Sequence, residues 1–158
     1  METILTSDTT FKKNTSAQLA MVFIICFAGN MFAGIVSTLM SVYLPVVVKE
    51  LRGNQSESQF NDMSAYINSI FIFGWAAGGL LWGVIGDKAG RKISLLLSIA
   101  CFGLFTLLIS QANQWWEIVV CRFLSGVGTG GLLVISFTLI SEVWPEKTRA
   151  VYTGILSI

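Results

Sequence analysis

A ten-residue segment near the middle of the chain holds the densest group of side chains that can form ion pairs. Residues 83–92 contain four charged side chains and three glycines, and long apolar runs lie on both sides of them. Glycine lets the backbone turn sharply, and opposite charges at neighbouring helix ends attract one another. We therefore interpret the segment as a tight charged turn between two helices. Its candidate functional residues are Gly83, Gly86, Asp87, Lys88, Gly90, Arg91 and Lys92.

A second charged pair, Glu142 and Arg149, lies at the end of a later apolar run. Two apolar runs separate this pair from residues 83–92, so both charged groups are expected on the same face of a membrane. Charges at that depth are partly shielded from water, so an ion pair there exceeds the about 0–1 kcal/mol of a surface pair. An acid at a helix end can also cap the positive N-terminus of a neighbouring helix. Glu142 is therefore a candidate partner for the basic residues of the turn.

Arg122 lies inside an apolar run, about two turns from its start. A charge within the bilayer costs several kcal/mol, so such a residue usually faces a cavity or a partner; the alternative is a side chain that reaches the nearer membrane surface. At about 100° per residue, Arg122, Ser125, Thr129 and Ser136 fall within about 60° of one another. This polar stripe predicts a helix that lines a solute pathway. Asn30 is a further cavity candidate, for which an interhelical hydrogen bond is an equally good explanation.

Glycines recur every four residues within two of the apolar runs. Such spacing lets helix backbones approach closely in lipid, where van der Waals contact holds helices together. It predicts helix-packing positions at Gly74, Gly78, Gly79, Gly126 and Gly130. Residues 126–131 also fit the dinucleotide-binding pattern G-x-G-x-x-G, but they follow no strand and lie inside an apolar helix. We therefore reject nucleotide binding.

The composition indicates a membrane protein. Hydrophobic residues make up 54% of the 158 residues and charged residues only 12%, about half the usual share of a soluble domain. The basic residues are scattered and the net charge is +1, which predicts no nucleic-acid partner. Histidine is absent and no carboxylates cluster in the apolar runs, so we expect no enzyme, no metal and no cofactor. The three cysteines lie in apolar runs and are interpreted as buried thiols.

Five apolar segments follow a polar tail at residues 1–18. A spanning helix needs about 20 apolar residues, which the first four segments supply, and the fifth is incomplete. The predicted helices are about 19–48, 62–86, 93–110, 115–143 and 148–158, with a polar loop at 49–61. Most basic residues fall in the tail and in the two connections on its side of the membrane, which predicts a cytoplasmic N-terminus in a plasma or inner membrane. A chain that stops inside a helix is expected to be a fragment.

Three of these groups resemble motifs of the major facilitator superfamily. Residues 83–92 resemble the signature loop between helices two and three, as Gly83-x-x-Gly86-Asp87-Lys88-x-Gly90-Arg91-Lys92. Arg122 and the glycines after it resemble the helix-four motif, as Arg122-x-x-x-Gly126-x-Gly128-x-Gly130. Glu142 and Arg149, with six residues between them, resemble an element that follows helix four in sugar porters and related organic-solute carriers. The motifs occur in the family's order and cover about residues 19–158.

The resemblance implies an all-α membrane protein with twelve helices in two halves, of which residues 19–158 would form part of the six-helix N-terminal half. It implies secondary active or facilitative transport of a small organic solute, a sugar or an organic anion, by alternating access. In the family, the acid corresponding to Asp87 caps a helix of the second half and helps to hold the inner gate shut. The arginine corresponding to Arg91 pairs with the acid corresponding to Glu142, and helices one and four line the cavity.

The expected partners are therefore the solute, the lipid bilayer and a C-terminal half of the same transporter, without which this chain is not expected to transport. Many proton-coupled members carry a carboxylate deep in helix one or four, where this sequence has Asn30, Thr129 and Ser136. Proton coupling through this half is therefore not indicated. The alternative function is a four-span channel or a helical assembly subunit of a membrane complex, which would not require the charged pairs at the inner turns.

Overall fold

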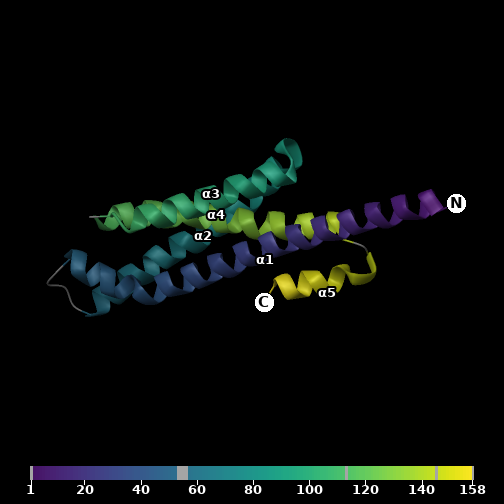
Figure 1. Cartoon of the computed structure of the whole chain (residues 1–158). Coiled ribbons are helices and arrows are strands. Elements are labelled where there is room, and N and C mark those ends of the chain that lie inside the picture. Colours follow the sequence, from purple (N-terminus) through teal and green to yellow (C-terminus); the bar gives the residue numbers. More distant parts are fainter. Residues whose placement is uncertain (1, 53–56, 113, 145, 158) are drawn as a thin grey trace.

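The computed structural model consists of long helices arranged side by side (Figure 1). It describes the backbone of residues 2–52, 57–112, 114–144 and 146–157, and the side chains from residue 17 onwards except at 50–58, 60, 113, 145, 147 and 158. Within these ranges every regular element is an α-helix. The helices are α1 (Glu2–Arg52), α2 (Glu57–Ala89), α3 (Arg91–Ile109), α4 (Trp115–Val143) and α5 (Glu146–Leu156).

Four of the helices contain stretches long and apolar enough to cross a membrane. These stretches have 33, 29, 19 and 29 residues and are Ala17–Lys49, Asn61–Ala89, Arg91–Ile109 and Trp115–Val143. At about 1.5 Å per residue, each spans or nearly spans the about 30 Å hydrocarbon core of a bilayer. The all-α membrane fold predicted from the sequence is confirmed. The short α5 turns back from the end of α4 and lies beside α1 (Figure 1).

Two helices extend further than the hydropathy of the sequence predicts. The expected loop at 49–61 is helical up to Arg52 and again from Glu57, while residues 53–56 lie outside the described residues. The prediction was wrong there because hydropathy marks only the lipid-embedded part of a helix, and Lys, Glu, Leu, Arg and Gln continue a helix well in water. α1 also begins at Glu2, inside the predicted polar tail, although Thr and Ser in that tail are weak helix formers. The cytoplasmic assignment of that tail stays a prediction.

The charged segment 83–92 is also more helical than a ten-residue turn. α2 continues to Ala89 and α3 begins at Arg91, so Gly90 alone makes the connection. Gly90 has φ 94° and ψ 143°, and it has the only positive φ among the described residues. Glycine occupies this region without the steric penalty that a Cβ brings. One residue therefore reverses the chain, and it brings the end of α2 next to the start of α3.

Helix α4 lies at the centre of the bundle, packed against α2 on one side and α3 on the other. In the apolar window of its spanning stretch, 50% of the residues are buried within the chain, whereas in that of α1 only 11% are buried. Two apolar clusters fill the contacts. One joins α1, α2 and α4 near the α1–α2 connection through Leu44, Val48, Ile67 and Ile118. The other, at the opposite end, includes Cys26, Ala33, Leu95, Leu132, Ile135, Ile140 and Leu156.

Glycines let α2 and α4 touch backbone to backbone. A Cβ added at Gly74 or Gly78 would collide with the carbonyl oxygen of Phe123 or Val127 on α4. The contact is reciprocal, because a Cβ at Gly126 or Gly130 would collide with backbone carbonyls of α2. Such close approach supplies the van der Waals contact that holds helices together in lipid.

The remaining spaced glycines differ from these four. A Cβ at Gly79 would lie 3.2 Å from a methyl group of Val134, whereas one at Gly83 would meet nothing within 4 Å. Gly83 therefore faces open space in the described chain, although its spacing from Gly79 matches that of a packing pair. The cysteine thiols are free, with Cys26 buried and the other two half-buried.

Candidate functional site

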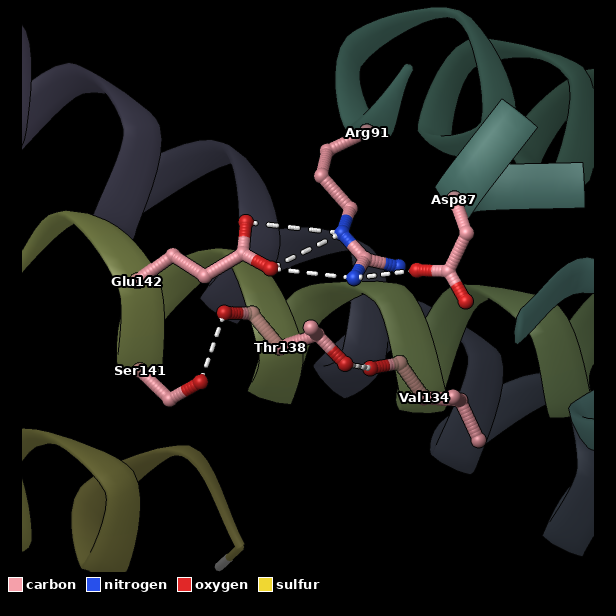
Figure 2. Close-up of polar contacts among 6 residues, drawn as sticks. All are labelled: Asp87, Arg91, Val134, Thr138, Ser141 and Glu142. Carbon is pink, nitrogen blue, oxygen red and sulfur yellow. Dashed lines mark hydrogen bonds and ion pairs between the residues drawn. The ribbon is translucent and has the colours of Figure 1, made fainter. Parts of the chain in front are cut away.

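Arg91 joins the ends of three helices through its guanidinium group. It is the first residue of α3, Asp87 lies in the last turn of α2, and Glu142 lies in the last turn of α4 (Figure 2). Arg91 Nη2 and Nε donate to Glu142 Oε1 at 2.9 and 3.1 Å, and Nε also approaches Oε2 at 3.4 Å. On the other side, Arg91 Nη2 lies 2.6 Å from Asp87 Oδ1. We call Asp87, Arg91 and Glu142 the inner charge cluster.

Two glycines place Arg91 in this position. Gly90 turns the chain so that Arg91 starts a new helix beside the one that carries Asp87. Gly86 is buried beneath the guanidinium, where an added Cβ would lie 2.9 Å from Arg91 Nη1. That is closer than a real Cβ contact, so Gly86 leaves the space that the guanidinium occupies. Sequence spacing assigned both glycines to the turn, but the role of Gly86 depends on packing.

The strength of the inner charge cluster depends on how far water reaches it. The side chain of Arg91 is 22% exposed, that of Glu142 47% and that of Asp87 66%. A planar guanidinium that binds a carboxylate through two nitrogens forms a stronger, more directional bond than a single contact. Partial exposure weakens each pair through solvent screening, most of all the pair with Asp87. Arg91–Glu142 is therefore the stronger link, and it connects α3 to α4.

The neighbouring hydroxyl groups leave the Glu142 carboxylate to Arg91. Thr138 Oγ1 donates to the Val134 carbonyl at 2.8 Å, and Ser141 Oγ donates to the Thr138 carbonyl at 2.7 Å (Figure 2). Both hydroxyls thus bond to the backbone of their own helix. The other two motif cations, Lys88 and Lys92, are exposed at the surface.

Arg149, the second member of the later charged pair, lies apart from the inner charge cluster. Its Nη2 donates to the carbonyl of Trp144 at 3.5 Å, and its Nε is buried without a partner. Among the described ion pairs, Glu142 is bonded to Arg91 and not to Arg149. The rings of Trp144 and Tyr152 pack at a tilt, with centroids 4.2 Å apart, and this contact supports the corner between α4 and α5.

Three of the five cavity candidates donate hydrogen bonds to the backbone of their own helix. Ser125 and Thr129 donate their hydroxyls to backbone carbonyls of α4, at 3.0 and 2.9 Å, and Asn30 donates to the Cys26 carbonyl on α1 at 2.8 Å. Arg122, Ser125 and Ser136 are buried, whereas Asn30 and Thr129 are half-buried.

A cavity of about 500 Å³ lies beside the start of the α1 span, and none of these five residues lines it. Its walls are apolar and aromatic, and they come from the start of the α1 span, from Trp144 and from α5. The polar stripe predicted from helical periodicity therefore exists as a face of α4 that packs against the other helices. Its role in a solute pathway stays a prediction.

Arg122 is buried to 2% exposure, which excludes a side chain that reaches the outer surface in this structure. Its Cζ lies 5.0 Å from the centre of the Phe71 ring on α2. A cation over an aromatic face gains about 0.5–2 kcal/mol, which offsets only part of the several kcal/mol that burial of a charge costs. Its Nε and Nη2 atoms have no hydrogen-bond partner. The sequence gives no signal for Phe71, because nothing in its spacing marks a partner for Arg122.

Other contacts between helices were not predicted from the sequence. Gly128 packs against the backbone of Phe102 on α3, and Gly131 against the ring of Trp82 on α2. Ser41 of α1 donates to Asn68 Oδ1 of α2 at 3.1 Å. Polar residues at facing helix positions are the kind of signal that marks such a bond, but pairing them requires the relative rotation of the two helices.

These observations define a multi-pass integral membrane protein whose central helices are joined by glycine contacts and, at one end, by a shared arginine. Comparison with known proteins identifies the family. Residues 20–158 match the model of the Major Facilitator Superfamily. The chain belongs to this superfamily, which confirms the resemblance drawn from the three motifs.

Similar curated proteins include transporters of hexoses. The chain is 38% identical to the low-affinity glucose transporter HXT3 of Saccharomyces cerevisiae over 84 residues, which are 52% of this chain and 15% of that protein. It is 39% identical over 93 residues to the hexose transporter HXT10 of the same yeast; these residues are 58% of this chain and 17% of HXT10. It is 37% identical over 89 residues to synaptic vesicle glycoprotein 2C of Mus musculus; these residues are 56% of this chain and 12% of that protein. The matches thus span less than a fifth of each of these relatives.

Proposed function

We propose that this chain acts in a carrier that moves a small organic solute across the membrane by alternating access. Transport is facilitative or secondary active, and the solute is a sugar or an organic anion. The observation that supports this most is the inner charge cluster, because its contacts join α2, α3 and α4 at one end of the bundle. A link of this kind is suited to a gate, since it can hold helix ends together in one state and release them in another.

We infer that the inner charge cluster lies on the cytoplasmic side, with the N-terminus. The start of the α1 span lies at the same end of the bundle, where Phe23 contacts Trp144 and Tyr152 with ring centroids 5.8 and 5.2 Å apart. Asp87 remains 66% exposed although Arg91 contacts one of its oxygens. Its carboxylate therefore has room for a further partner, in line with the helix-capping role that the family implies. Lys88, Lys92 and Arg149 then face the cytoplasm or the lipid head groups.

The solute class is supported by the relatives and by the site. Two relatives carry glucose or hexose in their names. The polar groups of Asn30, Ser125, Thr129 and Ser136 lie on the two helices that the family uses for its cavity, and they suit hydroxylated solutes. The matched segments cover only 12 to 17% of HXT3, HXT10 and synaptic vesicle glycoprotein 2C, so the activity of the whole relatives is a proposal here.

Uptake measurements test this proposal. The full reading frame would be expressed in cells that lack their own hexose carriers, and uptake of radiolabelled glucose, fructose and glucuronate would be measured. A carrier shows saturable uptake and accelerated exchange when unlabelled solute is preloaded, whereas a channel shows neither. Absence of uptake for every solute, with the protein in the membrane, contradicts the proposal.

The variant Asp87→Asn tests the gate. We expect uptake to fall about tenfold at unchanged expression, because loss of the helix-capping contact that the family implies for Asp87, worth about 1.4 kcal/mol in one state, shifts an equilibrium tenfold. Asp62→Asn is the matched control, since Asp62 is an exposed acid at the other end of α2. Unchanged uptake by Asp87→Asn would refute the gate role, and equal losses in both variants would show a general effect of charge.

A further inference from the structure

A small polar cluster joins α1 to α2, and part of its hydrogen-bonding capacity is not used. Ser41 of α1 lies between two acceptors, because its Oγ is 2.9 Å from the Ser37 carbonyl oxygen and 3.1 Å from Asn68 Oδ1 on α2. A hydroxyl has one hydrogen, so it fully donates to only one of them at a time. The Oγ of Ser37 is itself buried without a partner among the described residues. We call Ser37, Ser41 and Asn68 the α1–α2 polar cluster.

The α1–α2 polar cluster lies within the membrane-spanning part of the helices. Leu44 of α1 and Ile118 of α4 belong to one apolar cluster, and Ile118 is nearly one turn from Trp115 at the start of α4. Tryptophan at the end of a span is typical of the level of the lipid head groups. Because α1 and α4 run in opposite directions, Ser41 lies about 9 Å and Ser37 about 15 Å below that level, at about 1.5 Å per residue.

At this depth the two sides of α1 need different surroundings. Ser41 and Asn68 are half-buried, so the described chain covers them only in part. Asn68 accepts from Ser41 through its oxygen, while its amide nitrogen carries two N–H donors. Lipid chains offer no hydrogen-bond partner, and a polar group without one costs several kcal/mol in hydrocarbon. Leu39, about 160° away from Ser41 around the helix, is apolar and 52% exposed, which suits lipid.

We propose that the α1–α2 polar cluster binds hydroxyl groups of the transported solute, so that the carrier favours sugars and other polyhydroxylated solutes. The amide of Asn68 and the two serine hydroxyls can both donate and accept hydrogen bonds, as each hydroxyl of such a solute can. This subsite lies towards the end of the bundle opposite the inner charge cluster. The inference rests on the proposed transport function, and it extends the solute pathway to α2, on which none of the predicted cavity residues lies.

The reactivity of an introduced cysteine tests whether the cluster faces a water-filled pathway. Thr38 is exposed beside the cluster, and its hydroxyl donates to the Gly34 carbonyl of its own helix at 2.9 Å, so Thr38→Cys leaves the cluster intact. The full reading frame with Thr38→Cys or the control Leu39→Cys would be labelled by a charged methanethiosulfonate reagent, in membranes opened to both sides. The parent chain, with its three cysteines, gives the background. We expect Thr38→Cys to react several-fold faster than Leu39→Cys. Equal rates would mean that lipid or another protein segment covers this face, and they would overturn the proposal.

Protection of Thr38→Cys by solutes then tests the solute class. Glucose, sorbitol and myo-inositol are the probes, and glycine betaine at equal osmolarity, which has no hydroxyl group, is the control. We expect at least one probe to slow labelling in a saturable way. Adding Asn68→Leu or Ser37→Ala should raise the half-protecting concentration about 2- to 10-fold, the change expected for loss of a neutral hydrogen bond. Ser69→Ala should leave it unchanged, because the exposed Ser69 hydroxyl donates to the Ala65 carbonyl of its own helix at 2.8 Å.

The outcomes separate this subsite from the general function. The proposal is overturned if no probe slows labelling more than glycine betaine does, or if the half-protecting concentration stays the same in both Asn68→Leu and Ser37→Ala. Measuring both variants keeps the test decisive where one of them fails to reach the membrane. Saturable uptake of a radiolabelled probe that gives no protection leaves the carrier function and refutes the subsite. Protection without uptake supports the subsite and contradicts the carrier function.

Discussion

The two contacts of Arg91 predict a measurable difference in coupling energy. Its pair with Glu142 uses two guanidinium nitrogens and links residues 51 positions apart, while its pair with Asp87 uses one nitrogen and links residues four apart. Hydrogen bonds to charged groups are worth about 1.5–3 kcal/mol when shielded, and exposed pairs about 0.2–1 kcal/mol. With exposures of 22% and 47%, Arg91–Glu142 falls between these limits, at about 1 kcal/mol. Arg91–Asp87, with Asp87 66% exposed, should reach only about 0.3–0.5 kcal/mol.

A double-mutant cycle measures both values. Arg91→Gln would be combined in turn with Glu142→Gln and with Asp87→Asn, and the free energy of unfolding of each purified full chain measured in detergent. The coupling is the departure of the double variant from the sum of the single variants. Arg149→Gln combined with Glu142→Gln is the control, and it should be additive because Glu142 bonds to Arg91 rather than to Arg149.

Salt provides a second check on the same cycle. Raising ionic strength from about 0.1 to about 1 M shortens the screening length from about 10 to about 3 Å, so the coupling of the more exposed Asp87 should fall further than that of Glu142. Equal couplings at both acids, or a coupling between Arg149 and Glu142 as large as that between Arg91 and Glu142, would refute the geometry of the inner charge cluster.

Two further predictions concern the glycines. Gly90→Ala should lower the free energy of unfolding by about 1–2 kcal/mol, because φ 94° strains any residue with a Cβ. Gly83→Ala lies in a helix with open space around it, so it should leave the free energy of unfolding unchanged or raise it by about 0.5–1 kcal/mol. Chemical denaturation of the two variants measures this difference. Gly78→Ala should lower the free energy of unfolding by about 1–3 kcal/mol, because its Cβ would collide with the backbone at Val127. In Gly34→Ala the added Cβ meets nothing within 4 Å, so this variant should be tolerated. Equal stability of these two variants would contradict close contact between α2 and α4.

Features that depend on local composition were predictable from the sequence. The four spans follow from runs of apolar residues, because a backbone in lipid must satisfy its hydrogen bonds within a helix. The position of the turn follows from glycine between charges, although only Gly90 proved to be non-helical. The close approach of helices at Gly74 and Gly78 follows from their spacing, because two small residues four positions apart lie on the same face of a helix. The sequence also predicts Glu142 as a partner of the charged turn, from its membrane side and from the resemblance to the superfamily.

Which side chains contact one another depends on how the helices pack. Arg91 rather than Arg149 bonds to Glu142, and Gly86 supplies the space beneath the guanidinium. Arg122 turns inward to Phe71 rather than outward to the surface, and it is left with unused donors. Each outcome depends on the rotation and tilt of one helix against another. Those quantities are set by packing over the whole interface, so no single residue or interval in the sequence carries them.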